Sequence, residues 1–362
     1  MEALFKLLRI ALGTEAEARV PEGADWPALV ALAKEQGVAA VAYDGLQKCY
    51  EADSSLSLPL DRELKQVKYD WFGIVLQGEI DYVEYRRSIS ELASFYGELG
   101  IPMMLLKGYG LSLNYPVPAH RTSGDIDIYL FGRWKEADKA VADKLGIKVD
   151  NSHHHHSVFR LGRWSVENHY DFVNVHAHRS NLSIETELKG RASDRNIECV
   201  VDGTRVLLPN PDFNALFLLK HAASHFASTR LSLRQVLDWL LFVRQCGAEV
   251  DWPWLYEILR KENMARFANS LAAIGVECFG MDPALFHEIE EDKALVQRVL
   301  GDILEPEFKE SEKGDLLSAL WVKSRRWWKN RWKHRICYSD SLVSSFLWSL
   351  HAKFLKPAHF IH

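Results

Sequence analysis

The sequence lacks the features that mark disulfide-bonded, secreted and membrane-spanning proteins. Its five cysteines are an odd number, widely scattered and without a CxxC pair, which argues against a disulfide framework and a cysteine-based zinc site. No apolar run approaches the ~20 residues that span a bilayer, and residues 1–12 have neither a basic start nor a small-residue cleavage site. We therefore expect a protein of a reducing compartment, the cytoplasm, with no membrane span.

The chain does have the material for a sizeable core. Of its 362 residues, 48% are hydrophobic and 26% are charged, which is typical of a globular protein. This length favours two or three structural units. The spacing of apolar residues predicts a helical N-terminal region at 1–100, an α/β core at 101–210 and a helical C-terminal region at 211–362.

Periodicity and turn residues within the middle region predict a small sheet. We expect buried strands at 103–106 and 125–130, separated by a Lys-Gly turn and a short helix. Further strands are expected at 157–159, 165–175 and 205–208, and helices at 135–145, 212–243, 252–267, 271–279 and 283–303. The fold class that follows is α+β, with a small mixed sheet flanked by the two helical regions.

Two aspartates in the strand expected at 125–130 carry the strongest chemical signal. Successive side chains of a strand point to opposite faces, so Asp125 and Asp127 project together while Ile126 and Ile128 enter the core. Two carboxylates in one small volume repel each other unless a cation neutralises them, and oxygen ligands suit Mg²⁺ or Mn²⁺. The pair therefore predicts a metal site.

The residues ahead of these aspartates lead to a family resemblance. The stretch LLKGYGLSLNYPVPAHRTSGDIDIYL, residues 105–130, resembles the uncharacterised nucleotidyltransferase family of the polymerase-β-like superfamily. In that family a Leu-Lys-Gly turn precedes an Arg and a Gly-Asp-Ile-Asp-Ile strand. The resemblance implies a nucleotidyltransferase core, with Asp125 and Asp127 as catalytic metal ligands.

The resemblance also implies residues that contact the nucleotide. Candidates are Lys107, Gly108, Arg121 and Ser123, which flank the turn and the acidic strand. The wider superfamily usually has Gly-Ser at the turn, with the serine on a phosphate, whereas Tyr109 follows Gly108 here. Lys107 or backbone amides near Gly108 could take over that contact.

A third carboxylate on a neighbouring strand is implied as well. Glu167 is the first candidate, as a catalytic residue and metal ligand, and Asp171, which has the same strand parity, is the second. The implied reaction is metal-dependent transfer of a nucleoside monophosphate, AMP from ATP, to a hydroxyl of an unidentified small molecule or protein. The alternatives are a degenerate nucleotide-binding or protein-interaction regulator, and an enzyme that modifies nucleic-acid ends.

Several histidines have spacings that invite a metal site, but the sequence favours other roles for them. Adjacent residues of an extended segment alternate faces, so the tract at 153–156 is expected to be a solvated loop. His221 and His225 have helical i, i+4 spacing but lack the glutamate of an HExxH motif. We expect structural roles for them and for Asp238, which could pair with Arg234.

Residues 323–335 contain seven lysines and arginines, no acid and several tryptophans. The pattern could suit nucleic acid or an anionic membrane surface. A helix that packs its tryptophans on the core and extends its basic side chains into solvent is the favoured interpretation.

Overall fold

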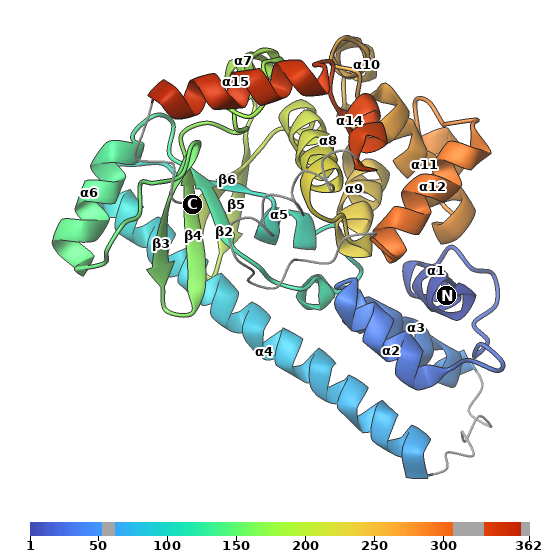
Figure 1. Cartoon of the computed structure of the whole chain (residues 1–362). Coiled ribbons are helices and arrows are strands. Elements are labelled where there is room, and N and C mark those ends of the chain that lie inside the picture. Colours follow the sequence, from blue (N-terminus) through green and yellow to red (C-terminus); the bar gives the residue numbers. More distant parts are fainter. Residues whose placement is uncertain (53–61, 307–328, 356–362) are drawn as a thin grey trace, which may run out of the picture.

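A mixed sheet of six strands lies at the centre of the described part of the chain. The computed structural model describes residues 1–52, 62–306 and 329–355 (Figure 1). The strands are β1 (Met104–Leu106), β2 (Ile126–Tyr129), β3 (His156–Leu161), β4 (Trp164–His169), β5 (Ile197–Val201) and β6 (Thr204–Leu208), in the order β3-β4-β2-β1-β6-β5. Pairs β2–β4 and β1–β6 are parallel, and the other three pairs are antiparallel.

One face of the sheet is covered by the long helix α4 (Arg62–Glu98) and by α6 (Trp134–Leu145). Tyr85, Ile89 and Tyr96 of α4 share a buried core with Ile126 and Ile128 of β2. Figure 1 shows α4 running diagonally from the N-terminal helices to the sheet. The alternation of β2 therefore sends its isoleucines toward α4 and its aspartates to the other face, as expected.

The opposite face of the sheet belongs to a larger core, to which the remaining helices contribute. Met104 and Leu106 of β1 share it with Phe213 and Phe217 of α8. The helices described outside the α4 side are α1 (Glu2–Leu12), α2 (Trp26–Glu35), α3 (Ala39–Ala52), α5 (Gly108–Ser112), α7 (Ser180–Arg191), α8 (Pro211–Ser228), α9 (Leu233–Cys246), α10 (Trp252–Lys261), α11 (Ala265–Phe279), α12 (Lys293–Leu304), α14 (Arg331–Cys337) and α15 (Leu342–Leu355).

The α+β class is confirmed, but several element boundaries were wrong. The expected helix at 212–243 is two helices, because Ser232 and Gln235 form a capping box that starts α9. The helix expected to run to residue 267 stops at Lys261, where Asn263 has a left-handed φ of 58°. In the last expected helix, residues 283–285 form only a 3₁₀ turn, and α12 begins after its N-cap Asp292.

The strand expected at 165–175 ends at His169, and both α7 and β5 were missed. The chain leaves the sheet because the backbone N–H groups of Phe172 and Val173 donate to the Glu185 carboxylate of α7 at 2.9 Å. Two irregular residues thus obtain partners from a helix further along the chain. None of the described helices combines the length and the apolar character needed to cross a membrane.

Candidate active site

The three acidic candidates meet on the open face of the sheet. Because β2 and β4 are parallel and Asp127 lies directly opposite Glu167, both side chains leave the sheet on the same side. Asp125, two residues before Asp127, follows the same parity. All three carboxylates line one cavity of about 610 Å³. Asp171, the other candidate for the third acid, is paired with Lys189 and is not part of the cavity lining.

Asp127 is the most strongly held of the three. Lys107 Nζ lies 2.9 Å from its Oδ1, and His169 Nε2 lies 3.1 Å from the same oxygen. His169 also approaches Glu167, with Nε2 3.5 Å from Oε2. Ligand atoms of Asp127, Glu167 and His169 all lie within 4.8 Å of one another. Carboxylate and imidazole ligands at this spacing form a plausible cradle for a divalent cation.

The ionisation of the carboxylates follows from these neighbours. Burial acts to raise the pKa of Asp127, but Lys107 and the hydrogen bond from His169 outweigh burial and hold that pKa below its ordinary value. Burial raises the pKa of the Asp125 carboxyl, with added contributions from the negative charges of Glu167 and Asp127. One aspartate is thus neutralised by the protein, and the other experiences an excess of negative charge.

The Lys-Gly turn after β1 has the unusual backbone that its sequence requires. Lys107 has φ 53° and Gly108 has φ 41°, both in the left-handed region that favours glycine. A Cβ on Gly108 would overlap the hydroxyl of Tyr85, which donates to the Asp125 carbonyl at 3.0 Å. The turn therefore packs directly against the strand entrance that carries Asp125, and both Lys107 and Gly108 line the cavity.

Arg121 lines the cavity but is held by another residue. Its Nε and Nη2 donate to the two carboxylate oxygens of Asp238 at 2.7 and 2.9 Å, and Tyr115 donates to the same carboxylate at 2.8 Å. The helical spacing predicts that Asp238 pairs with Arg234. In the structure Asp238 pairs with Arg121 instead. Ser123 is half-buried and is not part of the cavity lining.

The expectation of a solvated histidine loop was wrong for half of the tract. His156 is the first residue of β3 and is 7% exposed, and His155 lines the cavity. Burial lowers the pKa of His155 to about 2 and that of His156 to about 4. The chain bends at 153–155 as it enters β3, and the His155 and His156 ring centroids lie 4.2 Å apart.

Helix α8, whose histidines we expect to be structural, supplies a wall of the cavity. His221 and His225 both line the cavity, with ring centroids 4.4 Å apart. Burial lowers the pKa of His225 to about 4 and that of His221 well below its ordinary value. Lys220, which we did not single out, lines the cavity too, and burial lowers its pKa to about 7. The i, i+4 histidine spacing was the signal available in the sequence.

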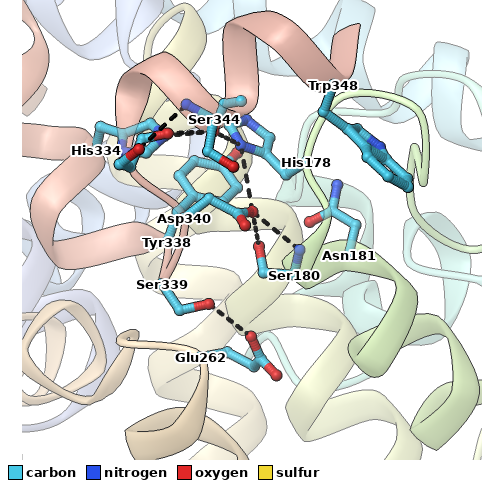
Figure 2. Close-up of polar contacts among 12 residues, drawn as sticks. His178, Ser180, Asn181, Glu262, His334, Tyr338, Ser339, Asp340, Ser344 and Trp348 are labelled. Carbon is cyan, nitrogen blue, oxygen red and sulfur yellow. Dashed lines mark hydrogen bonds and ion pairs between the residues drawn. The ribbon is translucent and has the colours of Figure 1, made fainter. Parts of the chain in front are cut away.

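The C-terminal segment closes one end of the cavity. Tyr338 lines it, with its ring 3.7 Å from that of His178 and under the Lys220 ammonium. Figure 2 shows Asp340, which accepts from the backbone N–H and the hydroxyl of Ser180. The Trp348 indole donates to the Val175 carbonyl. The lining of the cavity thus includes both the acids of the sheet and the buried amine of Lys220.

The basic segment at 323–335 is described only from residue 329 onward, so Trp327 and Trp328 lie outside the described residues. Within the described part, Trp332 packs edge-on against Phe226 of the core, as expected. Lys333 departs from the expectation, because it is buried and its Nζ lies 2.6 Å from the Asp302 carboxylate. Arg331 and Arg335 are exposed, so the described half of the segment is buried on one side and faces solvent on the other.

The α+β fold, with two parallel strands presenting facing acids beside a Lys-Gly turn, defines a nucleotidyltransferase-like protein. Residues 22–280 match the family model described as uncharacterised nucleotidyltransferase, and the chain belongs to this family. Among solved structures, an antigenic nucleotidyltransferase-like protein from Paracoccidioides brasiliensis is similar at 14% identity, over 56% of this chain and 96% of that chain, with a TM-score of 0.35. That similarity is too low to bear on function. Among curated proteins, none matches the chain.

Proposed function

We propose that this protein is a metal-dependent nucleotidyltransferase that transfers a nucleoside monophosphate, AMP from ATP, to a hydroxyl of a small-molecule or protein acceptor. The observation that carries the proposal is the direct opposition of Asp127 and Glu167 across β2 and β4, with Asp125 on the same face. These acids lie in a cavity of about 610 Å³, within the size range of small-molecule sites.

The residues of the site fit a divalent cation. Asp125, Asp127 and Glu167 offer hard oxygen ligands. Within the described residues, Asp127 forms ion pairs with two groups, the Lys107 ammonium and the His169 imidazole. A negative excess therefore remains at this end of the cavity. Bound Mg²⁺ or Mn²⁺ would neutralise phosphate charge and lower the pKa of the acceptor hydroxyl.

The proposed reaction is an in-line displacement at the α-phosphorus. The acceptor oxygen forms a bond to phosphorus, the bond to the bridging oxygen of pyrophosphate breaks, and pyrophosphate leaves with that electron pair. The acceptor proton passes to the Glu167 carboxylate. Lys107, at the mouth of the turn, binds phosphate oxygens. Arg121 is paired with Asp238, so we assign it a role in holding the residues around the cavity in place and not in binding the nucleotide.

Nucleotide binding tests the proposal most directly. We would titrate non-hydrolysable α,β-analogues of ATP, GTP, CTP and UTP with Mg²⁺ into the wild-type protein and an Asp125→Asn/Asp127→Asn variant by calorimetry. We expect Mg²⁺-dependent binding, with ATP preferred, and its loss in the double variant. Asp171→Asn is the matched control, because Asp171 lies near the site but pairs with Lys189.

Either result is informative because the control neutralises a carboxylate outside the cavity lining, whereas the double variant neutralises two within it. Retained binding in the control with loss in the double variant supports the metal site. If the folded wild-type protein binds none of the four analogues, the proposal fails and an interaction protein is favoured.

A nucleotide-binding regulator without turnover is the second candidate. The Lys107–Asp127 ion pair favours it, because the ammonium is within 2.9 Å of an oxygen that a metal would need. Such a protein would bind nucleotide equally well with and without Mg²⁺. We place transfer first because Glu167 faces Asp127 instead of turning away from it.

A further inference from the structure

Three histidine rings from two strands meet beside the acidic cluster. His156 of β3 and His169 of β4 are direct cross-strand partners, and His155 precedes β3. The ring centroids are 4.2 Å apart for His155 and His156, 5.2 Å for His156 and His169, and 5.7 Å for His155 and His169. One ligand nitrogen from each ring can be chosen so that all three lie within 4.8 Å of one another.

Two of these rings carry nitrogen atoms whose hydrogen-bonding capacity is unmet. Nδ1 of His155 and Nδ1 of His156 are buried and have no hydrogen-bond partner within the described part of the chain. The closest carboxylate oxygen to His156 Nδ1 is Glu167 Oε2 at 3.8 Å, which is too long for a hydrogen bond. An unsatisfied buried polar atom destabilises the fold, so two of them in one cluster point to a bound ligand.

The third ring is already oriented in the way that metal-binding histidines usually are. His169 Nδ1 lies 3.3 Å from the Asp171 carbonyl, which can only accept a hydrogen bond, so Nδ1 carries the proton. Its Nε2 faces Asp127 at 3.1 Å and Glu167 at 3.5 Å, and a bound metal would replace the proton that Nε2 donates to Asp127. A histidine that donates its other N–H to a backbone carbonyl has its tautomer and ring orientation fixed for coordination.

We propose that His155, His156 and His169 form a Zn²⁺ site that adjoins the carboxylate site and shares His169 with it, and whose metal binding does not require the proposed transferase activity. Imidazole nitrogen is a preferred ligand of zinc, whereas Mg²⁺ prefers oxygen. Zinc bound by three histidines keeps a fourth position open, and Glu167 is the adjacent group that can fill it. Zn–N distances of about 2.0–2.1 Å require the nitrogens to draw closer together, so the three rings must rotate toward the ion when it binds.

Zinc titration of the full chain tests this site without any nucleotide. Protein stripped of metal with a chelator would be titrated with Zn²⁺ alone by calorimetry, and with Co²⁺ while visible absorption is recorded. We expect one Zn²⁺ per chain and a Co²⁺ spectrum typical of a four-coordinate site. His155→Gln and His156→Gln should each weaken Zn²⁺ binding about tenfold or more, as the loss of a ligand does.

The histidine tract itself provides the matched control. His153 belongs to the same tract, but its side chain is 46% exposed, and we expect His153→Gln to bind Zn²⁺ like wild type. Asp125→Asn/Asp127→Asn should lose nucleotide and keep zinc, so failure of the transferase proposal would be distinguishable from failure of this one. Circular dichroism of each variant establishes that it is folded.

Three results would overturn the assignment: no stoichiometric Zn²⁺ binding by wild type, equal affinity in the folded His155 and His156 variants, or loss of zinc in the aspartate variant alone. The last would mean that the carboxylates, and not the imidazoles, hold the ion.

Discussion

The guanidinium of Arg121 and the carboxylate of Asp238 form a fully buried pair, at 2.7 and 2.9 Å. Removing one partner leaves the other charge buried without compensation, which costs ~3–5 kcal/mol. We therefore expect Arg121→Met to lower the free energy of unfolding by about 3 kcal/mol or more, measured by urea denaturation.

An exposed pair provides the comparison for this prediction. Arg133 is hydrogen-bonded to Glu136 on the surface, and Arg133→Met should change the free energy of unfolding much less than Arg121→Met does. If the two arginine variants lose similar stability, the Arg121–Asp238 pair does not stabilise the fold, and Arg121 is free to serve a ligand.

Lys220 gives a prediction with a definite pH dependence. Burial lowers its pKa to about 7, below the ordinary value of 10.5, so between these values the unfolded chain binds more protons than the folded one. The destabilisation caused by burying the charged amine is at its maximum below pH 7, and it disappears as the pH rises toward 10. Lys220→Met should therefore stabilise the protein by more than ~1 kcal/mol at pH 6, and by less at pH 9.

Urea denaturation of both proteins at pH 6, 7.5 and 9 measures this difference. Lys139→Met, at a side chain that is 75% exposed, should show no such trend. A stabilisation by Lys220→Met that is the same at all three values would show that the buried amine does not titrate in this range.

At Gly108 both the backbone conformation and the packing around it favour glycine over any other residue. Its φ of 41° costs an L-residue ~1–2 kcal/mol, and a Cβ there would overlap the Tyr85 hydroxyl. We expect Gly108→Ala to destabilise the protein by more than the backbone cost alone. In a Tyr85→Phe background the same substitution should cost only about the backbone amount, ~1–2 kcal/mol, because the overlapping atom is absent.

The four unfolding free energies of this double-mutant cycle decide the matter. A cost of Gly108→Ala that is identical in both backgrounds would mean that the turn moves away from Tyr85 when it accepts a methyl group.

At this scale the sequence predicted what short-range geometry controls. Alternation along a strand placed Asp125 and Asp127 on one face and their isoleucine neighbours on the other, and the structure follows it. The partner of Asp238 was mistaken because Arg121 comes from a loop more than a hundred residues away. Helical spacing pointed to Arg234, and no local pattern can reveal a contact made by tertiary packing.

At the scale of elements, the C-terminal segment is fixed to α7 by one carboxylate. Asp340 accepts from the backbone N–H of Ser180 at 2.9 Å and from its hydroxyl at 2.7 Å (Figure 2). Hydrogen bonds to a charged group contribute ~1.5–3 kcal/mol, so we expect Asp340→Ala to speed amide exchange in residues 329–348 about tenfold or more. Hydrogen exchange with mass-spectrometric detection measures the effect.

Asp143→Ala serves as the control, because that carboxylate lies on the exposed surface of α6. Unchanged exchange of the C-terminal segment in Asp340→Ala would mean that the stacked Tyr338 and His178 rings hold it without the carboxylate.

The elements predicted well were those with a strong internal period, such as α6 and β2. Those missed, α7 and β5, have weak patterns: β5 leaves most of its residues exposed or half-exposed, and α7 contains Gly190 and is capped by a distant aspartate. The early end of β4 depends on Glu185, which lies beyond the expected strand. Such boundaries follow from contacts between elements, which periodicity does not contain.

At the scale of the whole molecule, α4 belongs to both hydrophobic cores. Trp71 and Val75 pack in the larger core with α1, whereas Tyr85 and Ile89 pack under the sheet with β2. We expect the two cores to unfold together, so that Ile89→Ala, which removes ~2–5 kcal/mol of packing, lowers amide protection equally in α1 and in β2.

Native-state hydrogen exchange measures amide protection in α1 and in β2 in the same experiment. If α1 keeps its protection while β2 loses it, the cores are separate cooperative units in spite of the shared helix.

Because α4 contributes to both cores, the number of residues between Val75 and Tyr82 determines how the two sets of core side chains are oriented relative to each other. Each residue turns an α-helix by about 100°, so one added or deleted residue in this interval would rotate one set of core side chains away from its partners by that angle. The surfaces of Leu76 and Ile80 in the interval are exposed, and their identities can vary at little cost. This stretch sets the rotation of one half of the helix relative to the other. We therefore expect it to tolerate substitutions but not insertions or deletions.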